Sequence, residues 1–305
     1  MDVVQRDLSV FAKNFHSSKL SFGESMRKHT TFCVGGLATL MVEAHSTHDV
    51  VLALGLAKEA DIEAMVIGKG SNLIVLDKGL DKVVIRLGDS FGGLALEGND
   101  IVAQAGVSLE KLSSFALESG LSGLEFACGI PGTLGGGIYM NAGAYGGQLA
   151  DIVSSVSMVT PALTITEANS ESMGFGYRKS RVQSGGEIVS SVRLSLKQAS
   201  KSDILSLMQE NTRLREEKQP LEYPSAGSIF KRPTGFFAGK LISDAGLKGV
   251  RIGGAQVSEK HAGFIVNTGG ATAQNIVDLI KHVQERVYAT SGVALETEVK
   301  IIGLA

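Results

Sequence analysis

The sequence predicts an α+β protein, and three features of the chain indicate this fold class. Strand and helix patterns alternate through the first part of the chain, and short strands dominate the middle. The final part contains the clearest amphipathic helix. An alternating region followed by a run of strands is typical of a protein in which sheets and helices share the cores.

The first part of the chain predicts a small α/β unit. Residues 37–45 predict a strand, and residues 47–62 predict a helix with Thr47 as its N-cap. Residues 64–87 predict three strands separated by two turns. The first of these turns, GKGSN at residues 68–72, is expected to project from the end of a strand.

The middle of the chain is richer in strands. Residues 100–107 predict a strand, and residues 108–120 a helix in which Ser108 begins an imperfect capping box around Glu110 and Lys111. A glycine-rich loop follows. After it, alternation predicts the strands of a half-buried sheet at residues 154–160, 162–168 and 187–197.

The last part of the chain predicts two long helices and a closing strand. Residues 201–218 form the first helix, and residues 219–227, which contain two prolines, are expected to be a hinge between domains. We expect the chain to end in a strand at residues 296–303. The second helix, residues 272–292, is expected to bury a face made of Ile276, Leu279, Ile280, Val283 and Val287.

Composition limits the class of protein. A chain of 305 residues is long enough for two or three domains, and 44% hydrophobic with 20% charged residues is typical of a soluble globular protein. The net charge of −2 does not indicate binding to nucleic acid or to an anionic membrane. The N-terminal sequence MDVVQRDLSVFAKNF lacks the pattern of a signal peptide, and no stretch is apolar for long enough to span a bilayer.

Cysteine and histidine usage predicts neither disulfides nor a metal site. The two cysteines, Cys33 and Cys128, are too few for a disulfide framework, so we expect both to be reduced in a cytoplasmic protein. The histidines have no metal-ligand spacing, and we expect His45 and His48 to be a solvated pair.

The most unusual stretch is the apolar loop IPGTLGGGIYMNAGAYG at residues 130–146. Eight of the nineteen residues from Gly129 to Gly147 are glycine, against 38 in the whole chain, and none is charged. A merely flexible linker would be polar. Glycine lets the main chain approach a ligand closely and expose its N–H groups.

Neither glycine loop matches a standard nucleotide motif. In GKGSN, Lys69 is followed by Gly70, so the loop is not a Walker A sequence, and Ile130 and Pro131 interrupt a GxGxxG pattern in the longer loop. The sequence therefore supports neither a P-loop kinase nor a Rossmann dehydrogenase. Both loops suit a pyrophosphate held by neutral N–H donors from two sides, and the alternative is that both are tight structural turns.

Several longer motifs resemble one family in the family's own order. GKGSNLIVLDKG (68–79) and GLEFACGIPGTLGGGIYMNAGAYG (123–146) resemble the two flavin loops of the UDP-N-acetylenolpyruvoylglucosamine reductase (MurB) family, in its shorter (type II) form. The resemblance extends from about residue 27 to the end of the chain. The other matching motifs are TTFCVGG (30–36), FGYRKSR (175–181), QPLEYPSAGSIFKRP (219–233), AGKLISDAGLKGVRIGGAQVSEKHAGFIVN (238–267) and ETEVKIIG (296–303).

The resemblance implies a fold and an activity. The fold is an FAD-binding module of the vanillyl-alcohol-oxidase (PCMH) type in two α/β subdomains, plus a smaller α+β domain for a UDP-sugar. The activity is that of UDP-N-acetylmuramate dehydrogenase, in which NADPH reduces FAD and the flavin reduces an enolpyruvyl ether during peptidoglycan synthesis. The expected domains are residues 1–88, residues 89–212 joined by strand 294–305, and residues 213–293 for the substrate.

The resemblance also assigns site residues. Arg178 is expected to hold the substrate carboxylate, Ser228 to donate the proton, and Glu298 to polarise the carboxylate or relay a proton. Lys218, Tyr145 and Arg232 are expected to bind the UDP-sugar. The residues expected to bind the cofactor are Gly68, Lys69, Gly70, Ser71, Asn72, Leu73, Gly129, Ile130, Pro131, Gly132, Gly135, Gly136, Asn141, Ala142 and Gly143.

Two departures from the family pattern and two alternative functions remain. The family usually has Asn where Arg232 and Gly263 stand here, and Arg232 lies beside the substrate loop. Another oxidoreductase of the same flavin fold would lack the motifs that contain Ser228 and Glu298. A flavin- or nucleotide-binding protein without activity, such as a regulator, would have no reason to keep Arg178, Ser228 and Glu298. We expect a cytoplasmic monomer that binds no nucleic acid, membrane or metal.

Overall fold

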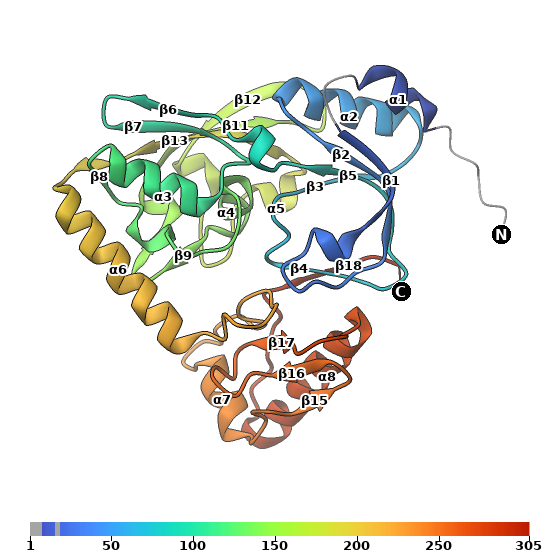
Figure 1. Cartoon of the computed structure of the whole chain (residues 1–305), viewed down its shortest axis with the longest axis vertical. Helices are drawn as coiled ribbons and strands as arrows, with labels where there is room; N and C mark the ends of the chain where they lie inside the picture. Colours follow the sequence, from blue (N-terminus) through green and yellow to red (C-terminus); the bar gives the residue numbers. More distant parts are fainter. Residues whose placement is uncertain (1–7, 16–18, 305) are drawn as a thin grey trace. The chain divides into compact units, whose positions relative to one another are not determined.

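The computed structural model describes residues 8–15 and 19–304 (Figure 1). His16 and the first seven residues, on which part of the signal-peptide argument depends, lie outside this range. The described chain forms two compact units. Unit 1 comprises Met1–Phe22, Leu40–Lys69 and Lys82–Leu214, and unit 2 comprises Gly23–Thr39, Gly70–Asp81 and Arg215–Ala305. The expected three-domain division remains a prediction.

Two sheets organise unit 1. The first has the order β1-β2-β5-β3 and is formed largely by unit 1 residues, and β3 runs parallel to β5. The second, with the order β12-β11-β13-β7-β6, is antiparallel throughout. The strands are β1 Lys19–Ser25, β2 Leu37–Glu43, β3 Ala64–Ile67, β5 Leu80–Arg86, β6 Leu94–Glu97, β7 Asp100–Gln104, β11 Val153–Val159, β12 Ile165–Asn169 and β13 Ile188–Ser195.

Helices and short pairings complete unit 1. Helix α4 packs against β7 and β13 of the antiparallel sheet (Figure 1). The helices are α1 Ser9–Asn14, α2 Thr47–Glu59, α3 Leu109–Glu118, α4 Leu134–Met140, α5 Val182–Gly185 and α6 Lys201–Lys218, whose last turn belongs to unit 2. The 3₁₀ turns are η2 Asp89–Phe91, η3 Glu125–Ala127, η4 Leu149–Asp151 and η5 Glu171–Met173, and the short strands are β8 Leu121–Ser122, β9 Gly143–Ala144, β10 Gly147–Gln148 and β14 Lys197–Gln198.

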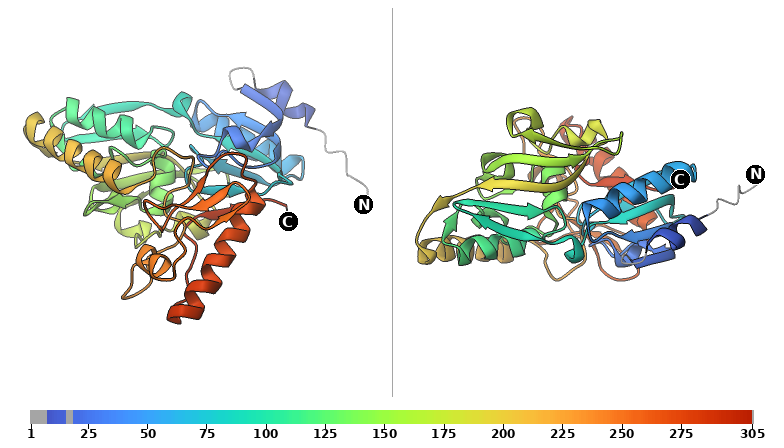
Figure 2. Two further views of the ribbon diagram at one scale, coloured as in Figure 1. Left: turned by 60° about the horizontal axis from the view of Figure 1, so that its bottom comes forward. Right: turned by 90° about the horizontal axis from the view of Figure 1, so that it is seen from above.

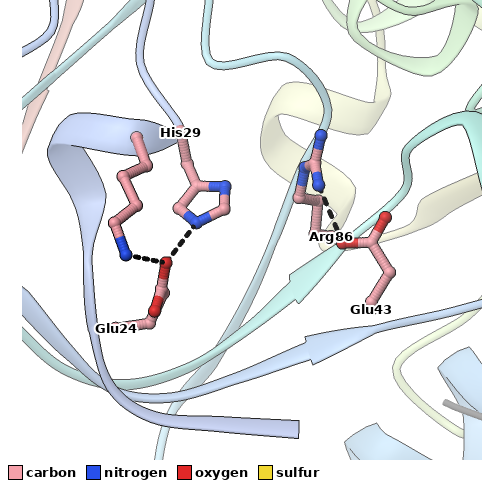
Figure 3. Close-up of polar contacts among 5 residues, drawn as sticks. Glu24, His29, Glu43 and Arg86 are labelled. Atoms are coloured by element: carbon pink, nitrogen blue, oxygen red, sulfur yellow. Dashed lines mark hydrogen bonds and ion pairs between the residues drawn. The ribbon is translucent and has the colours of Figure 1, made fainter. Parts of the chain in front are cut away.

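Local sequence explains where these elements begin. Ser108 caps α3 by accepting the N–H of Lys111. The prediction of Thr47 as the cap of α2 is wrong, because the Ser46 hydroxyl accepts the N–H of Asp49 and Thr47 is already helical. Between the strands, Arg86 on β5 forms an ion pair with Glu43 on β2, at 2.9 Å between nitrogen and oxygen (Figure 3).

Unit 2 consists of a small antiparallel sheet, two helices and a parallel strand pair. The sheet has the order β15-β16-β17, and α8, the long red helix of Figure 2, packs on β15 and β16. Strand β4 pairs in parallel with β18 near the chain end. The elements are η1 Met26–Lys28, β4 Leu73–Val75, α7 Ala238–Asp244, β15 Arg251–Ile252, β16 Ala255–Val257, β17 Ile265–Asn267, α8 Ala273–Ser291 and β18 Lys300–Ile302.

The predicted amphipathic helix is confirmed. All five residues of its expected apolar face are at most 2% exposed. Thr272 caps α8 in a capping box with Asn275, and Asp77 accepts the N–H groups of Ala273 and Gln274. Throughout residues 8–15 and 19–304, no helix combines the length and apolar character needed to cross a bilayer.

Several elements differ from the sequence expectations. The stretch LGGGIYM, expected to be loop, forms helix α4, because the Thr133 side chain caps it and its glycines pack closely. The expected strand 296–303 is regular only over Lys300–Ile302. Strand β6, helix α7 and the three strands of the small sheet were not anticipated, because each is too short to show a clear period.

Candidate active site

The first glycine loop, residues 68–72, presents an array of free main-chain donors. It connects β3 to β4. Among the described residues, the N–H groups of Lys69, Gly70, Ser71 and Asn72 have no hydrogen-bond acceptor. Two of its carbonyl groups are used, since the N–H of Thr31 donates to Gly70 O and that of Lys300 to Asn72 O. Consecutive free N–H groups in a tight turn form a binding site for an anion.

Close main-chain packing requires glycine in this loop. A Cβ on Gly70, whose φ is +62°, would lie 2.0 Å from the carbonyl oxygen of His29. The His29 segment is itself fixed, because Nε2 of His29 lies 2.9 Å from a carboxylate oxygen of Glu24 (Figure 3). This hydrogen bond lowers the pKa of Glu24. The first glycine loop therefore packs against a segment, at His29, that is itself held in place by a hydrogen bond.

Gly68 brings the two glycine loops together within unit 1. A Cβ on Gly68 would lie 2.2 Å from Oγ1 of Thr133, in the second glycine loop, residues 129–147. Thr133 is only 2% exposed, so it cannot move away into solvent. The two loops are thus in direct contact although they are far apart in the sequence.

The second glycine loop uses many of its N–H groups internally. The N–H of Leu134 donates to Val107 O, and that of Gly135 to Ala105 O. The N–H groups of Gly136 and Gly137 donate to Oγ1 and to the carbonyl of Thr133. In this part of the loop the main chain is a packing element, which differs from the expectation that the whole loop offers its donors to a ligand. Within the described chain, the N–H groups of Gly129, Gly132 and Thr133 have no acceptor.

Asn141 organises the end of the second loop. It is 2% exposed and left-handed, with φ +42°, as is common for a helix C-cap. Its amide nitrogen donates to Gln148 Oε1 and to Gly176 O, and its Oδ1 accepts the N–H of Ala150. Both side-chain donors are therefore used within the protein, so the side chain positions the loop, and its expected contact with the cofactor remains a prediction. The next residue, Ala142, donates its N–H to Gly137 O.

Arg178 lies in a strained two-residue turn of unit 1. Gly176 and Lys179 exchange main-chain hydrogen bonds, and Arg178 has φ +55°. For a residue with a Cβ this conformation is costly, and such strain is concentrated at functional sites. The guanidinium carbon lies 5.3 Å from the Tyr177 ring centre, and both terminal nitrogens lie 3.5 Å from Gly143 O of the second loop.

Ser228 and Glu298 lie on neighbouring segments of unit 2. Ile229, which is fully buried, accepts the N–H of Glu298 on its carbonyl at 2.7 Å. Phe230 and Thr297 form an isolated β-bridge beside it. The hydrogen bond between Ile229 and Glu298 therefore holds the main chain of Glu298 beside the segment that contains Ser228.

The same segment is connected to the first glycine loop. Nδ2 of Asn72 donates to Glu298 O at 3.2 Å, and the next strand residues, Leu73 and Lys300, are paired. Within unit 2 the segment that carries the free N–H groups of Gly70, Ser71 and Asn72 therefore lies beside the main chain of Glu298.

The expected substrate residues are less closely organised. Lys218 is exposed at the end of α6. Arg232 stacks over the exposed Phe237 ring, with 4.0 Å from the guanidinium carbon to the ring centre. Tyr145, with φ +50°, lies at the tip of the β9–β10 hairpin and lines a cavity of about 450 Å³ in unit 1 together with Glu125 and Asn211.

Sequence reasoning missed two residues that organise the site. Thr133 caps α4 and contacts Gly68, and a Thr before an apolar helix was a usable capping signal. Ile229 had no such signal, because its role depends on main-chain pairing. No group of three or more His, Cys, Asp or Glu side chains in the described residues could hold a metal ion, and Cys33 and Cys128 are free thiols.

Comparison with known proteins identifies the family. Residues 219–302 match the model of the UDP-N-acetylenolpyruvoylglucosamine reductase C-terminal domain, and residues 38–169 match an FAD binding domain. The chain is 48% identical to the UDP-N-acetylenolpyruvoylglucosamine reductases of Alkaliphilus oremlandii and Clostridioides difficile, in each case over 92% of both chains. The crystal structure of the reductase (MurB) from Thermus caldophilus is 38% identical and has a TM-score of 0.82, covering 94% of this chain and 99% of that one.

The site fits the cofactor that the match implies. The FAD-binding match contains both glycine loops. The consecutive free N–H groups of residues 69–72 suit a diphosphate, and no acidic side chain belongs to either loop. The α+β fold is that of the FAD-binding module predicted from the resemblance. The chain belongs to the UDP-N-acetylenolpyruvoylglucosamine reductase (MurB) family and is an FAD-dependent oxidoreductase.

Proposed function

We propose that this protein reduces the enolpyruvyl ether of UDP-N-acetylglucosamine enolpyruvate to UDP-N-acetylmuramate, with NADPH as the source of hydride. The reaction is the one for which its family is named, and it belongs to peptidoglycan synthesis. Bound FAD supplies a carrier that takes hydride from the nicotinamide and gives it to the substrate. One observation carries the proposal. The carbonyl of Ile229, the residue after Ser228, accepts the N–H of Glu298, and Asn72 of the first glycine loop donates to the carbonyl of Glu298.

The chemistry of the substrate defines what the side chains must do. Addition of hydride to the terminal methylene carbon leaves negative charge on the carbon that carries the carboxylate. A fixed cation lowers the energy of this enolate-like state, and a positioned acid completes the reaction by protonating that carbon.

Three residues are proposed to meet these needs. The Arg178 guanidinium binds the carboxylate and stabilises the developing charge, and the strained turn fixes its direction. Ser228 delivers the proton from its hydroxyl. A serine is a weak acid, so it depends on Glu298 to polarise the carboxylate or to relay a replacement proton.

Lys218, Tyr145 and Arg232 are proposed to bind the UDP-sugar. Lysine and arginine side chains suit the diphosphate, and an exposed tyrosine suits the face of a ring. At Arg232 the stack on Phe237 already orients the guanidinium, which supports a role for arginine where the family usually has asparagine. We also propose that the protein acts in the cytoplasm as a monomer and has the three domains expected from the sequence.

Half-reactions measured separately test the assignment of Ser228. In Ser228→Ala, reduction of bound FAD by NADPH is expected to stay near normal. Reoxidation by the enolpyruvyl substrate is expected to slow by at least ~100-fold, as for other positioned acids. Stopped-flow absorbance of the flavin measures both steps.

Ser225→Ala, three residues away, is the matched control and is expected to leave both rates unchanged. Equal damage to the two half-reactions in Ser228→Ala would contradict its role as proton donor. A purified protein that is colourless and cannot be reconstituted with FAD would contradict the whole proposal.

A further inference from the structure

His261 is a half-buried histidine that the proposed mechanism does not use. It lies in the turn between β16 and β17 of unit 2. Oγ of Ser258 accepts the N–H groups of Lys260 and His261, each at 3.2 Å. The carbonyl of His261 accepts the N–H of Phe264 at 2.9 Å. The turn is therefore held by its own hydrogen bonds.

The imidazole ring adds a further hydrogen bond to this turn. Its Nδ1 accepts the N–H of Gly263 at 3.2 Å, and its edge packs on the Phe264 ring with 4.9 Å between ring centres. A Cβ at position 263 would lie 3.0 Å from Cε1 and 3.2 Å from Nδ1 of His261. Glycine at position 263, where the resemblance leads us to expect asparagine, thus gives the ring room to approach the main chain.

This turn is connected to Ser228. Ser228 and Phe264 form an isolated β-bridge, and the N–H of Ile229 donates to Gly263 O at 2.9 Å. Gly263 therefore receives the His261 side chain on its N–H side and holds Ile229 through its carbonyl. The carbonyl of Ile229 also accepts the N–H of Glu298, so one route of hydrogen bonds connects the imidazole to Glu298 and to Ile229, the residue that follows Ser228.

The hydrogen bond from Gly263 requires neutral His261. A ring nitrogen accepts a hydrogen bond only when it carries no proton, so the proton of the neutral ring is on Nε2. Burial lowers the pKa of His261 from its usual 6.5, a hydrogen bond with the main chain of His261 opposes part of this change, and the charge of Lys248 adds to the lowering.

Other charged side chains around the turn are engaged elsewhere. Lys260 donates to Glu216 O, and Lys240 on α7 pairs with Asp244. Oε1 of Glu259, within the turn, lies 3.5 Å from the amide nitrogen of Gln256.

We propose that neutral His261 is a positioning residue that holds Ser228 in register for proton delivery, and that its protonation slows reduction of the substrate. The inference rests on the proposed role of Ser228. The pKa of His261 is depressed, so the contribution of the neutral ring is complete above pH 6.5 and is lost as the pH falls through the lower pKa of the folded protein. Reduction of FAD by NADPH needs no proton from Ser228, so under this proposal it is expected to keep its rate.

Two substitutions at one position separate positioning from packing. His261→Asn keeps an acceptor near Nδ1 that does not titrate, so the loss of rate at acid pH is expected to disappear while the rate at pH 8 stays within about threefold. His261→Phe keeps the ring without the acceptor, and reoxidation of the flavin by the substrate is expected to slow by roughly 10- to 100-fold at every pH. Gly263→Ala, which displaces the ring, is expected to give a smaller loss in the same step.

The experiment is stopped-flow of both half-reactions from pH 5 to pH 9, with the intact FAD-loaded enzyme and thermal unfolding of each variant. An acid limb that persists unchanged in His261→Asn overturns the proposal, as does an equal loss in both half-reactions. If His261→Phe does not fold, the pH profile of His261→Asn by itself still tests whether neutral His261 positions Ser228. Normal reoxidation in Ser228→Ala would instead contradict the proposed role of Ser228, on which the inference depends.

Discussion

The two glycine loops of this protein look alike in sequence but their glycines serve different purposes. The first loop, residues 68–72, has four consecutive N–H groups, from Lys69 to Asn72, without an acceptor in the described chain. The second, residues 129–147, uses the N–H groups of Leu134 to Gly137 within the protein. Glycine in the first loop exposes donors, whereas in the second loop it mainly lets helix α4 and its neighbours pack.

Steric contacts at Gly70, Gly137 and Gly147 show the same difference. A Cβ on Gly70 would meet main chain, at the His29 carbonyl. In the second loop, Cβ atoms on Gly137 and Gly147 would meet the side chains of Leu149 and Phe126. Damage to the first loop should therefore affect the cofactor, and damage to the second should affect folding.

The largest expected effect is on FAD binding by Gly70→Ala. The new Cβ must displace main chain at His29, which distorts the donor array, so FAD affinity is expected to fall by at least ~100-fold, or about 2.8 kcal/mol. Isothermal titration of FAD into apoprotein measures this. Gly98→Ala is the matched control, because Gly98 has a similar φ of +65° but no atom within 4 Å. Unchanged affinity in Gly70→Ala would contradict the role of the first loop.

The next effect is a loss of stability in Asn141→Ala. Three hydrogen bonds of a buried side chain disappear, so the free energy of unfolding is expected to fall by roughly 2–4 kcal/mol. Denaturant titration measures it. Asn141→Gly tolerates the left-handed φ and loses only the hydrogen bonds, so it should be about 1 kcal/mol more stable than Asn141→Ala. A stable Asn141→Ala that has lost FAD would instead make Asn141 a direct cofactor ligand.

The smallest expected effect is a difference in stability between alanine substitutions at two adjacent glycines of α4. A Cβ on Gly137 lies 2.7 Å from a methyl group of buried Leu149, so Gly137→Ala is expected to cost about 1–3 kcal/mol through overpacking. For Gly136 the nearest atom is 3.7 Å away, so Gly136→Ala should be neutral or stabilising by up to ~1 kcal/mol. Thermal unfolding distinguishes them. If Gly136→Ala is stable but binds FAD weakly, the cofactor approaches the helix there, as the sequence predicted.

Much of the fold could be predicted because long elements have a regular period. The apolar face of α8 and the strands β11, β12 and β13 follow from alternation and helical spacing. Short elements such as α7 and β15 carry too few residues for a period to show. Helix α4 was missed for another reason: three consecutive glycines oppose a helix, and tertiary packing against Ala105 and Leu149 overrides that preference.

In the candidate site, too, some features could be predicted from the sequence and others could not. The resemblance selected Arg178, Ser228 and Glu298 by number, but it gave no account of how they are held. Ile229 pairs with Gly263 and Glu298 through its main chain, and this pairing joins segments that are far apart in the sequence. His261 accepts the N–H of Gly263 on its ring, a contact that no sequence pattern indicates. The strain at Arg178 was equally invisible, since the sequence around it contains no residue that favours a left-handed turn at that position.

By itself the sequence determined the α+β class, the family and the identity of the candidate residues, because composition, periodicity and motif order are properties of the chain alone. Only the tertiary structure decided which glycines expose their N–H groups and which are used for packing. The reason is that an N–H group is free or satisfied according to the acceptors that folding brings to it, and those acceptors, such as Ala105 and Val107 for α4, lie outside the motif.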